Sequence, residues 1–146
     1  MRHRVKTKRL SRDTEHRKAM LKNLASSLVI NKKIVTTTAK AKFLRPYIEK
    51  LITRAKSGEN YSNVRYMKQK LIGYDTVKAI LSEIGPKFSD RKGGYTRIVK
   101  LGNRGGDNAP LARVEILSEK PIKADKTTKS LPKPKKVKKE IEASNE

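Results

Sequence analysis

The sequence predicts a two-layer α+β domain with a basic extension at each end. Apolar residues recur at helical spacing up to about residue 84, and after residue 94 they alternate as they do along a strand. The composition then becomes rich in Lys after about residue 119, which bounds the domain. We therefore expect a helix, a short strand, three helices and a two-strand hairpin, with a small mixed sheet packed by helices.

The first helix should begin near Ser11, Asp13 or Thr14, each of which is a plausible N-cap, with Glu15 well placed in the first turn. Its apolar residues are Met20, Leu21, Leu24, Ala25 and Leu28, and the pattern fades by Asn31. The β-branched run over residues 34–38 predicts a short strand or an extended link.

The second helix has the clearest apolar stripe in the chain. The stripe consists of Ala41, Leu44, Ile48, Leu51, Ile52 and Ala55. Pro46 is expected in the first turn of this helix, where proline is tolerated, and Ser57-Gly58 should end it.

Two weaker helices and a hairpin follow. Val64, Met67 and Leu71 indicate one helix, and Val77, Ile80, Leu81 and Ile84 indicate another that Gly85-Pro86 should stop. Residues 95–101 and 111–117 alternate as strands do, and residues 102–110 are loop chemistry throughout, so the two strands should form a hairpin with a long polar tip.

The charge balance predicts a polyanionic partner. The 146 residues contain 37 Lys plus Arg against 14 Asp plus Glu, a net charge of +23. Nucleic acid phosphates would supply the missing negative charge. The chain has no Cys, which excludes disulfides, thiolate zinc sites and Cys nucleophiles. No apolar run approaches the roughly 18 residues of a membrane span, and no secretory signal is expected.

Charge and composition divide the chain into three parts. Residues 1–12 are predicted to be a basic RNA-binding arm, residues 13–118 a globular domain, and residues 119–146 a disordered Lys-rich tail. All twelve Arg lie at or before Arg113. Because Arg is the better bidentate phosphate ligand, we expect specific contacts from the arm and the domain, and diffuse attraction from the tail.

The residues predicted to contact RNA fall into four segments. They are Arg2, His3, Arg4, Lys6, Lys8, Arg9 and Arg12 in the arm; His16, Arg17 and Lys18 at the start of the first helix; Thr36, Thr37, Lys40 and Lys42 at the start of the second; and Arg91, Lys92, Gly93, Gly94, Tyr95, Arg97, Asn103 and Arg104 in the hairpin region.

Structural alternatives remain for several of these residues. The arm could be a solvated charge run, His16 a partly buried helix residue, and Tyr95 a core residue at a turn into a strand. Lys40 and Lys42 could simply solvate their helix. The sequence predicts no metal site, since two His thirteen positions apart without Cys are a poor set of ligands, and it predicts neither a cofactor nor an enzyme.

Several segments resemble a known family. MRHR at residues 1–4, HRKAM at 16–20, ASSL at 25–28, TTTAKAK at 36–42, EKLITRAK at 49–56, IGPKFSDRKGGYTRI at 84–98 and GDNAPLARVEI at 106–116 come in a familiar order. From Met1 to about Leu117 the chain resembles the bacterial ribosomal large-subunit protein L-seventeen family. It departs from the family pattern at residues 13–15, at Leu111 and in the tail.

The resemblance implies a non-enzymatic cytoplasmic protein of the large ribosomal subunit. Such a protein binds large-subunit ribosomal RNA near the peptide exit tunnel, stabilises its folded structure and contacts neighbouring large-subunit proteins. It has no cofactor, no membrane partner and no small-molecule substrate. The alternative function is that of a general DNA-compacting protein of the nucleoid type, which would use the same charge without base specificity.

Overall fold

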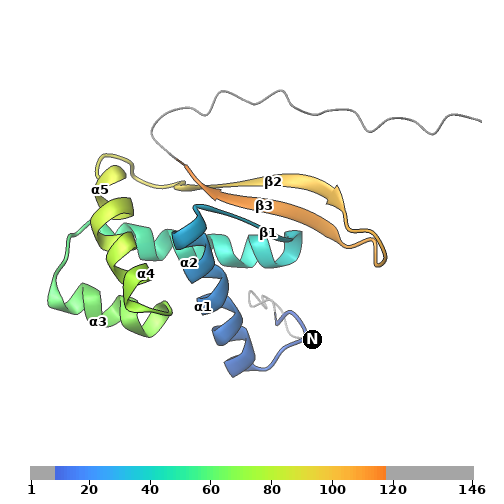
Figure 1. Ribbon diagram of the computed structural model, residues 1–146, viewed down its shortest axis with the longest axis horizontal. Helices are drawn as coiled ribbons and strands as arrows, with labels where there is room; N and C mark the ends of the chain where they lie inside the picture. Colours follow the sequence, from blue (N-terminus) through green and yellow to red (C-terminus); the bar gives the residue numbers. More distant parts are fainter. Residues whose placement is uncertain (1–8, 118–146) are drawn as a thin grey trace, which may run out of the picture.

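The computed structural model describes residues 9–117, which contain five α-helices, one π-helical segment and three strands (Figure 1). The three strands form one layer, and the helices lie on one side of it. This arrangement confirms the predicted two-layer α+β fold. Most of the predicted arm and all of the tail after Leu117 lie outside the described residues.

Helix α1 (Thr14–Asn31) begins after Asp13, and Glu15 lies in its first turn as expected. Leu21, Ala25, Leu28 and Val29 are buried along its inner side. The helix ends where Lys32 adopts a left-handed conformation, with φ 62°, and its N–H donates to the carbonyl of Leu28. This turn leads directly into the first strand.

The sheet contains β1 (Lys33–Thr37), β2 (Thr96–Asn103) and β3 (Pro110–Ile116) in the spatial order β1-β3-β2. Both pairings are antiparallel, so the prediction of a mixed sheet was wrong. The reason is topological: the hairpin turns β3 back along β2, and β3 then lies between β2 and β1. Since β1 and β2 point the same way, the strand between them is antiparallel to both.

The two faces of the sheet have different environments. Val114 and Ala112 of β3, together with their neighbours Ile34 and Ile98, face the helices and close the core. The alternate residues Lys33, Arg97, Val99, Arg113 and Glu115 lie on the other face. Within residues 9–117 no helix covers that face (Figure 1).

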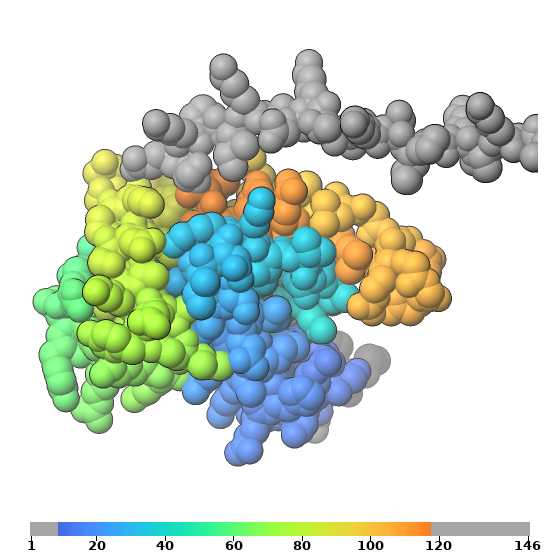
Figure 2. Space-filling view, in the orientation of Figure 1, coloured from blue at the N-terminus to red at the C-terminus, as the bar shows by residue number. Residues whose placement is uncertain are grey.

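Strand β2 is one residue longer than predicted, β3 has the predicted length but begins one residue earlier, and the loop at the tip is shorter, covering residues 104–109. The pairing of β2 with β3 shifts register between Lys100 and Gly102. Gly102 has φ +101°, a conformation that favours glycine and allows this bulge. The hairpin end projects beyond the body of the domain (Figure 2).

Helix α2 (Thr38–Ala55) begins with no linker after β1 and packs against α1, the sheet and the later helices. All six residues of its predicted stripe are buried. Pro46 lies in the third turn rather than the first, so that prediction was wrong. The helix starts earlier than its apolar stripe does, and Pro46 is on an exposed side where the missing N–H costs least.

Helix α3 (Tyr61–Lys70) buries Asn63 and Met67. Helix α4 (Tyr74–Ala79) then continues into a π-helical segment (Ile80–Ile84) and the short α5 (Gly85–Lys87). The predicted stop at Gly85-Pro86 was therefore placed a few residues too early. Pro86 falls just after the π-helical segment, where the backbone hydrogen-bond pattern is already interrupted.

No helix in the described part of the chain is long and apolar enough to cross a membrane.

Candidate nucleic-acid interface

Two hollows follow one another along the exposed side of α2, where it faces the edge strand β2. We call them together the α2–β2 groove. The first hollow, of ≈ 360 Å³, is lined by Thr38, Lys42, Arg45, Ile98 and Lys100. Three of these five side chains are basic, and they come from two segments more than fifty residues apart in the sequence.

The second hollow, of ≈ 600 Å³, lies between the C-terminal half of α2 and the loop before β2. Its basic side chains are Lys50, Arg54 and Lys92, and its hydroxyl groups come from Thr53 and Ser57. Arg54 is held in place, because its Nε donates to Asn63 Oδ1 over 3.1 Å and its guanidinium lies 4.1 Å from the centre of the Tyr66 ring.

The groove is strongly cationic. Its lining contains six basic side chains and one carboxylate, that of Glu49. Glu49 Oε1 accepts hydrogen bonds from Arg45 Nε over 3.2 Å and from Thr96 Oγ1 over 3.1 Å. The single negative charge is thus occupied within the protein, and the other five cations face solvent without a carboxylate partner in the described residues.

Helical spacing explains why α2 presents this row. Lys42, Pro46 and Lys50 recur every four residues opposite the apolar stripe, so burial of the stripe turns them outward. Strand β2 is at the edge of the sheet, and Lys100 and Ile98 lie on its helix-facing side. The groove therefore follows from packing α2 under an edge strand.

The loop at residues 91–95 closes one end of the groove. Tyr95 is 1% exposed, and its ring packs against Phe88 with 5.2 Å between the centres. Its hydroxyl donates to the carbonyl of Arg91, which also accepts from Lys56 Nζ. Tyr95 thus lines the second hollow together with Lys92 and Gly93, but it is a core residue, and its ring is too buried to stack on a base.

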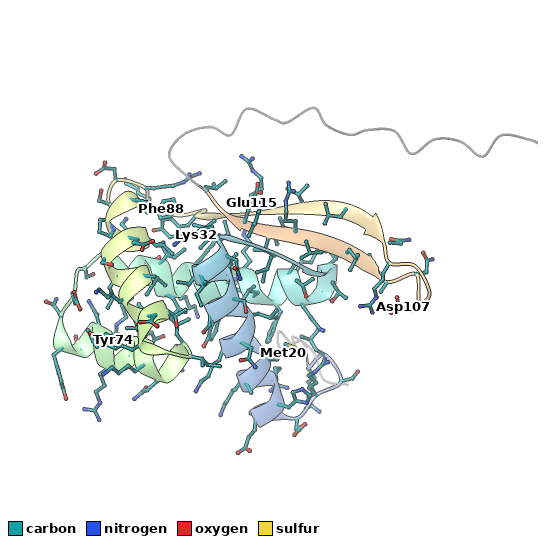
Figure 3. The ribbon with its side chains drawn as sticks, in the orientation of Figure 1. Met20, Lys32, Tyr74, Phe88, Asp107 and Glu115 are labelled. Carbon is teal, nitrogen blue, oxygen red and sulfur yellow. The ribbon has the colours of Figure 1, made fainter. Side chains whose placement is uncertain are left out.

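The hairpin tip holds Arg104 in an internal contact. Its Nε and Nη2 donate to the two carboxylate oxygens of Asp107 over 3.0 and 2.6 Å. This pairing and the N–H of Ala109 lower the pKa of Asp107 to about 2. Asn103 donates to the side chain of Asn108. Asp107 is therefore a turn residue, and Figure 3 shows it at the far end of the hairpin.

Other predicted contacts lie on separate surfaces. Arg97 is on the open face of the sheet, 3.7 Å from Glu115, which also lies 3.4 Å from Arg113. Thr36, Thr37 and Lys40 are half-buried near the start of α2, and Arg91 and Gly94 flank the groove without lining it.

The start of α1 forms a second basic surface. Arg9, His16 and Lys18 are exposed, while Arg12 and Arg17 are half-buried, with Arg17 donating to the carbonyl of Arg12. The predicted contacts Arg2, His3, Arg4, Lys6 and Lys8 lie outside the described residues.

Beside this surface, a hollow of ≈ 250 Å³ brings Lys18 together with Lys22 and Lys70. Tyr47 also lines it and donates to the carbonyl of Lys70 over 2.7 Å. Burial raises the pKa of the Tyr47 phenol to about 12.

The structure thus joins predicted Lys42, Lys92, Gly93 and the buried Tyr95 with residues that sequence reasoning missed: Arg45, Lys50, Arg54 and Lys100. The four-residue spacing of basic residues along α2 was a usable signal for Lys50 and Arg54, but no sequence pattern reports that β2 lies alongside. Residues 9–117 contain no group of three His, Cys, Asp or Glu that could hold a metal ion.

Comparison with known proteins adds two findings. The family described as "Ribosomal protein L17" matches residues 20–117. The "Large ribosomal subunit protein bL17" of Akkermansia muciniphila is 52% identical over 117 residues, which cover 80% of this chain and 85% of that protein.

Proposed function

The chain belongs to the ribosomal protein L17 family, and from this premise we propose that it binds large-subunit ribosomal RNA and stabilises its folded structure. As a member of this family it is a structural constituent of the large ribosomal subunit in the cytoplasm, and not an enzyme. No observation favours the DNA-compacting alternative.

The α2–β2 groove is the observation that supports RNA binding. Six cations line it, and its one carboxylate is bonded to Arg45 and Thr96. Clustered cations along a concave, low-dielectric wall produce a field that attracts phosphate. The hydroxyl of Ser57 on the same wall can donate to a phosphate oxygen, whereas those of Thr38 and Thr53 already donate to the carbonyls of Pro110 and Glu49.

The proposed mechanism is electrostatic positioning. The groove is formed by a packed helix and strand, so binding RNA there requires no further loss of conformational entropy from these elements. The basic residues of the predicted arm at 1–12 would add charge-assisted bonds to phosphates. The family resemblance also implies a site near the peptide exit tunnel, with neighbouring large-subunit proteins as further partners.

The test replaces three groove lysines at once, in a K42A/K50A/K100A variant. A matched control, K33A/K78A/K87A, removes the same charge from exposed lysines outside the groove. Binding to a large-subunit RNA fragment is measured against salt concentration. Six phosphate contacts correspond to a log–log slope of about −4 to −5, and the groove variant should reduce its magnitude by about 2 to 3.

The control variant should change the slope by less than about 1. Equal effects of the two triple variants would contradict the groove as the RNA site. A second test sediments a cell extract through a sucrose gradient in about 0.5 M salt. Screening at that salt releases loosely held basic proteins, so a firmly bound protein should be recovered with the large subunit.

A further inference from the structure

The outer face of α3 is a second surface with its own chemistry. Tyr61, Val64, Arg65, Lys68 and Gln69 recur at three- and four-residue intervals and line a groove of ≈ 320 Å³. Tyr61, the first residue of the helix, is 83% exposed. The residues Tyr61–Lys70 include three basic side chains and no acidic one.

Tyr74, the first residue of α4, extends this surface. It is 61% exposed, and Lys68 Nζ lies 5.5 Å from the centre of its ring. Lys68 therefore lies between the two tyrosines, lining the groove of one and contacting the ring of the other. Figure 3 places Tyr74 at the end of the molecule away from the hairpin tip.

The fold does not account for these two rings. The other three tyrosines have structural contacts: Tyr47 bonds the carbonyl of Lys70, Tyr66 packs under Arg54, and Tyr95 is buried. Within residues 9–117, the hydroxyls of Tyr61 and Tyr74 make no hydrogen bond, and neither ring belongs to the core cluster. Both rings are thus largely exposed, and neither is needed to close the core.

We propose that Tyr61 and Tyr74 stack on unpaired bases of RNA, while Arg65 and Lys68 hold the adjoining phosphates. We call these four residues the α3–α4 stacking surface. Aromatic rings interleaved with cations suit single-stranded nucleic acid, since every base offers a flat face and every nucleotide a phosphate. The groove volume is at the low end of the roughly 300–1,000 Å³ typical of small-ligand sites, which suits a nucleobase.

Charge favours RNA over a protein partner here. A protein interface usually has few charges at its centre, whereas Arg65 and Lys68 both line this groove without a carboxylate partner in the described residues. Paired RNA does not fit the surface either, because its bases are already stacked. The inference rests on the proposed function for the presence of RNA, but it assigns a separate surface and a different class of contact.

The first experiment uses ultraviolet cross-linking of intact large subunits that contain the full chain. A base stacked on an aromatic ring is positioned for zero-length cross-linking. Mass spectrometry should find nucleotide adducts on the peptides with Tyr61 and Tyr74. Tyr47 and Tyr66 serve as internal controls, because the fold already engages them, and should stay unmodified. Cross-links from Tyr61 and Tyr74 to protein, or none to RNA, would overturn the proposal.

The second experiment measures binding of a single-stranded oligoadenylate and of an RNA duplex with equal charge. Y61A/Y74A should lower the affinity for the single strand about fivefold or more, since the loss of even one base–aromatic stack predicts this much. Its affinity for the duplex should stay within about twofold of the unsubstituted protein's. Y61F/Y74F keeps the rings and should bind normally. Y61L/Y74L keeps apolar area without the π face and should behave as the Ala variant does.

The binding results distinguish a failure of the stacking surface from a failure of the α2–β2 groove. The K42A/K50A/K100A variant should bind both RNAs more weakly. If only that variant lost affinity, the stacking surface would be overturned and the groove would stand as the RNA site. A loss confined to the tyrosine variants would do the reverse. Normal binding by Y61L/Y74L would also overturn stacking, because any apolar side chain would then suffice. Thermal unfolding of each variant confirms that the fold persists.

Discussion

Thr96 Oγ1 donates a hydrogen bond to Glu49 Oε1 over 3.1 Å, which joins the first residue of β2 to the middle of α2. Arg45 donates to the same oxygen from one turn earlier in the helix. Glu49 thus lies where the two hollows of the α2–β2 groove meet, and it links the strand to the helix there. The one acidic residue of the groove therefore connects β2 to α2, but its negative charge opposes phosphate binding.

Replacing Glu49 by Gln should therefore strengthen RNA binding. Gln retains an oxygen that can accept from Thr96, but it removes the negative charge from the groove. We expect about twofold to fivefold tighter binding at low salt, the range that a partly exposed charge pair usually contributes. The gain should shrink in about 0.5 M salt.

The control for this prediction is E83Q. Glu83 is also a paired carboxylate, 3.1 Å from Lys32, but it lies outside the groove. Its replacement should leave affinity nearly unchanged. Unchanged or weaker binding by E49Q would contradict the groove as the place where phosphate accumulates.

Gly85 should be intolerant of substitution by Ala. A Cβ at this position would lie 2.7 Å from the carbonyl oxygen of Ala55 at the end of α2, and this backbone oxygen, which accepts from the N–H of Gly58, has little room to move. We expect G85A to lower the free energy of unfolding by about 1–3 kcal/mol, as overpacking does. Denaturant unfolding of both proteins measures the difference.

Gly105 is the matched position for comparison. A Cβ there has no neighbour within 4 Å, so G105A should change the free energy of unfolding by less than about 0.5 kcal/mol. Similar stability of the two Ala variants would mean that α5 and α2 are not in close backbone contact.

The carboxyl group of Asp107 should titrate at about pH 2, below its ordinary value of 3.8. Its depressed pKa means that the pairing with Arg104 orders the hairpin tip above about pH 4 and is lost as the pH falls from 4 towards 2. NMR titration of the side-chain carboxyl carbon measures this value directly. In R104A the pKa should return towards 3.8, whereas in K100A it should stay low.

Periodicity was sufficient to predict the helices and the hairpin, because burial of one face repeats at the period of the element. The junction of β1 and α2 was harder to place. Thr36, Thr37 and Thr38 are all β-branched, yet the strand ends at Thr37 and the helix begins at Thr38. Local propensity is the same on both sides of that boundary, and packing of the two elements decides it.

The end of the α4 segment shows a second limit. Gly85-Pro86 is typical of a helix stop, but the chain stays helical to Lys87. The close approach of Gly85 to Ala55 is a contact across thirty residues, and it explains the glycine better than a stop does. Local patterns do not contain such distant contacts.

The binding residues divide in the same way. Basic segments were visible in the sequence, and Lys42, Lys92 and Gly93 do line one groove. The prediction could not distinguish Tyr95 in the core from Tyr95 at the surface, because both are common where a turn enters a strand. Nor could it pair Lys100 with Lys42, since that proximity depends on which strand is at the edge.

The order β1-β3-β2 also determines when the protein can fold. The central strand is the last of these three in sequence order, and its register joins Lys33 to Glu115. During synthesis, β1 has no partner until residues 110–116 have been made and released from the ribosome. The helices can form as they appear, but sheet closure waits for the carboxyl end of the domain. A nascent chain that stalls before residue 110 would therefore present an unpaired strand and an incomplete groove.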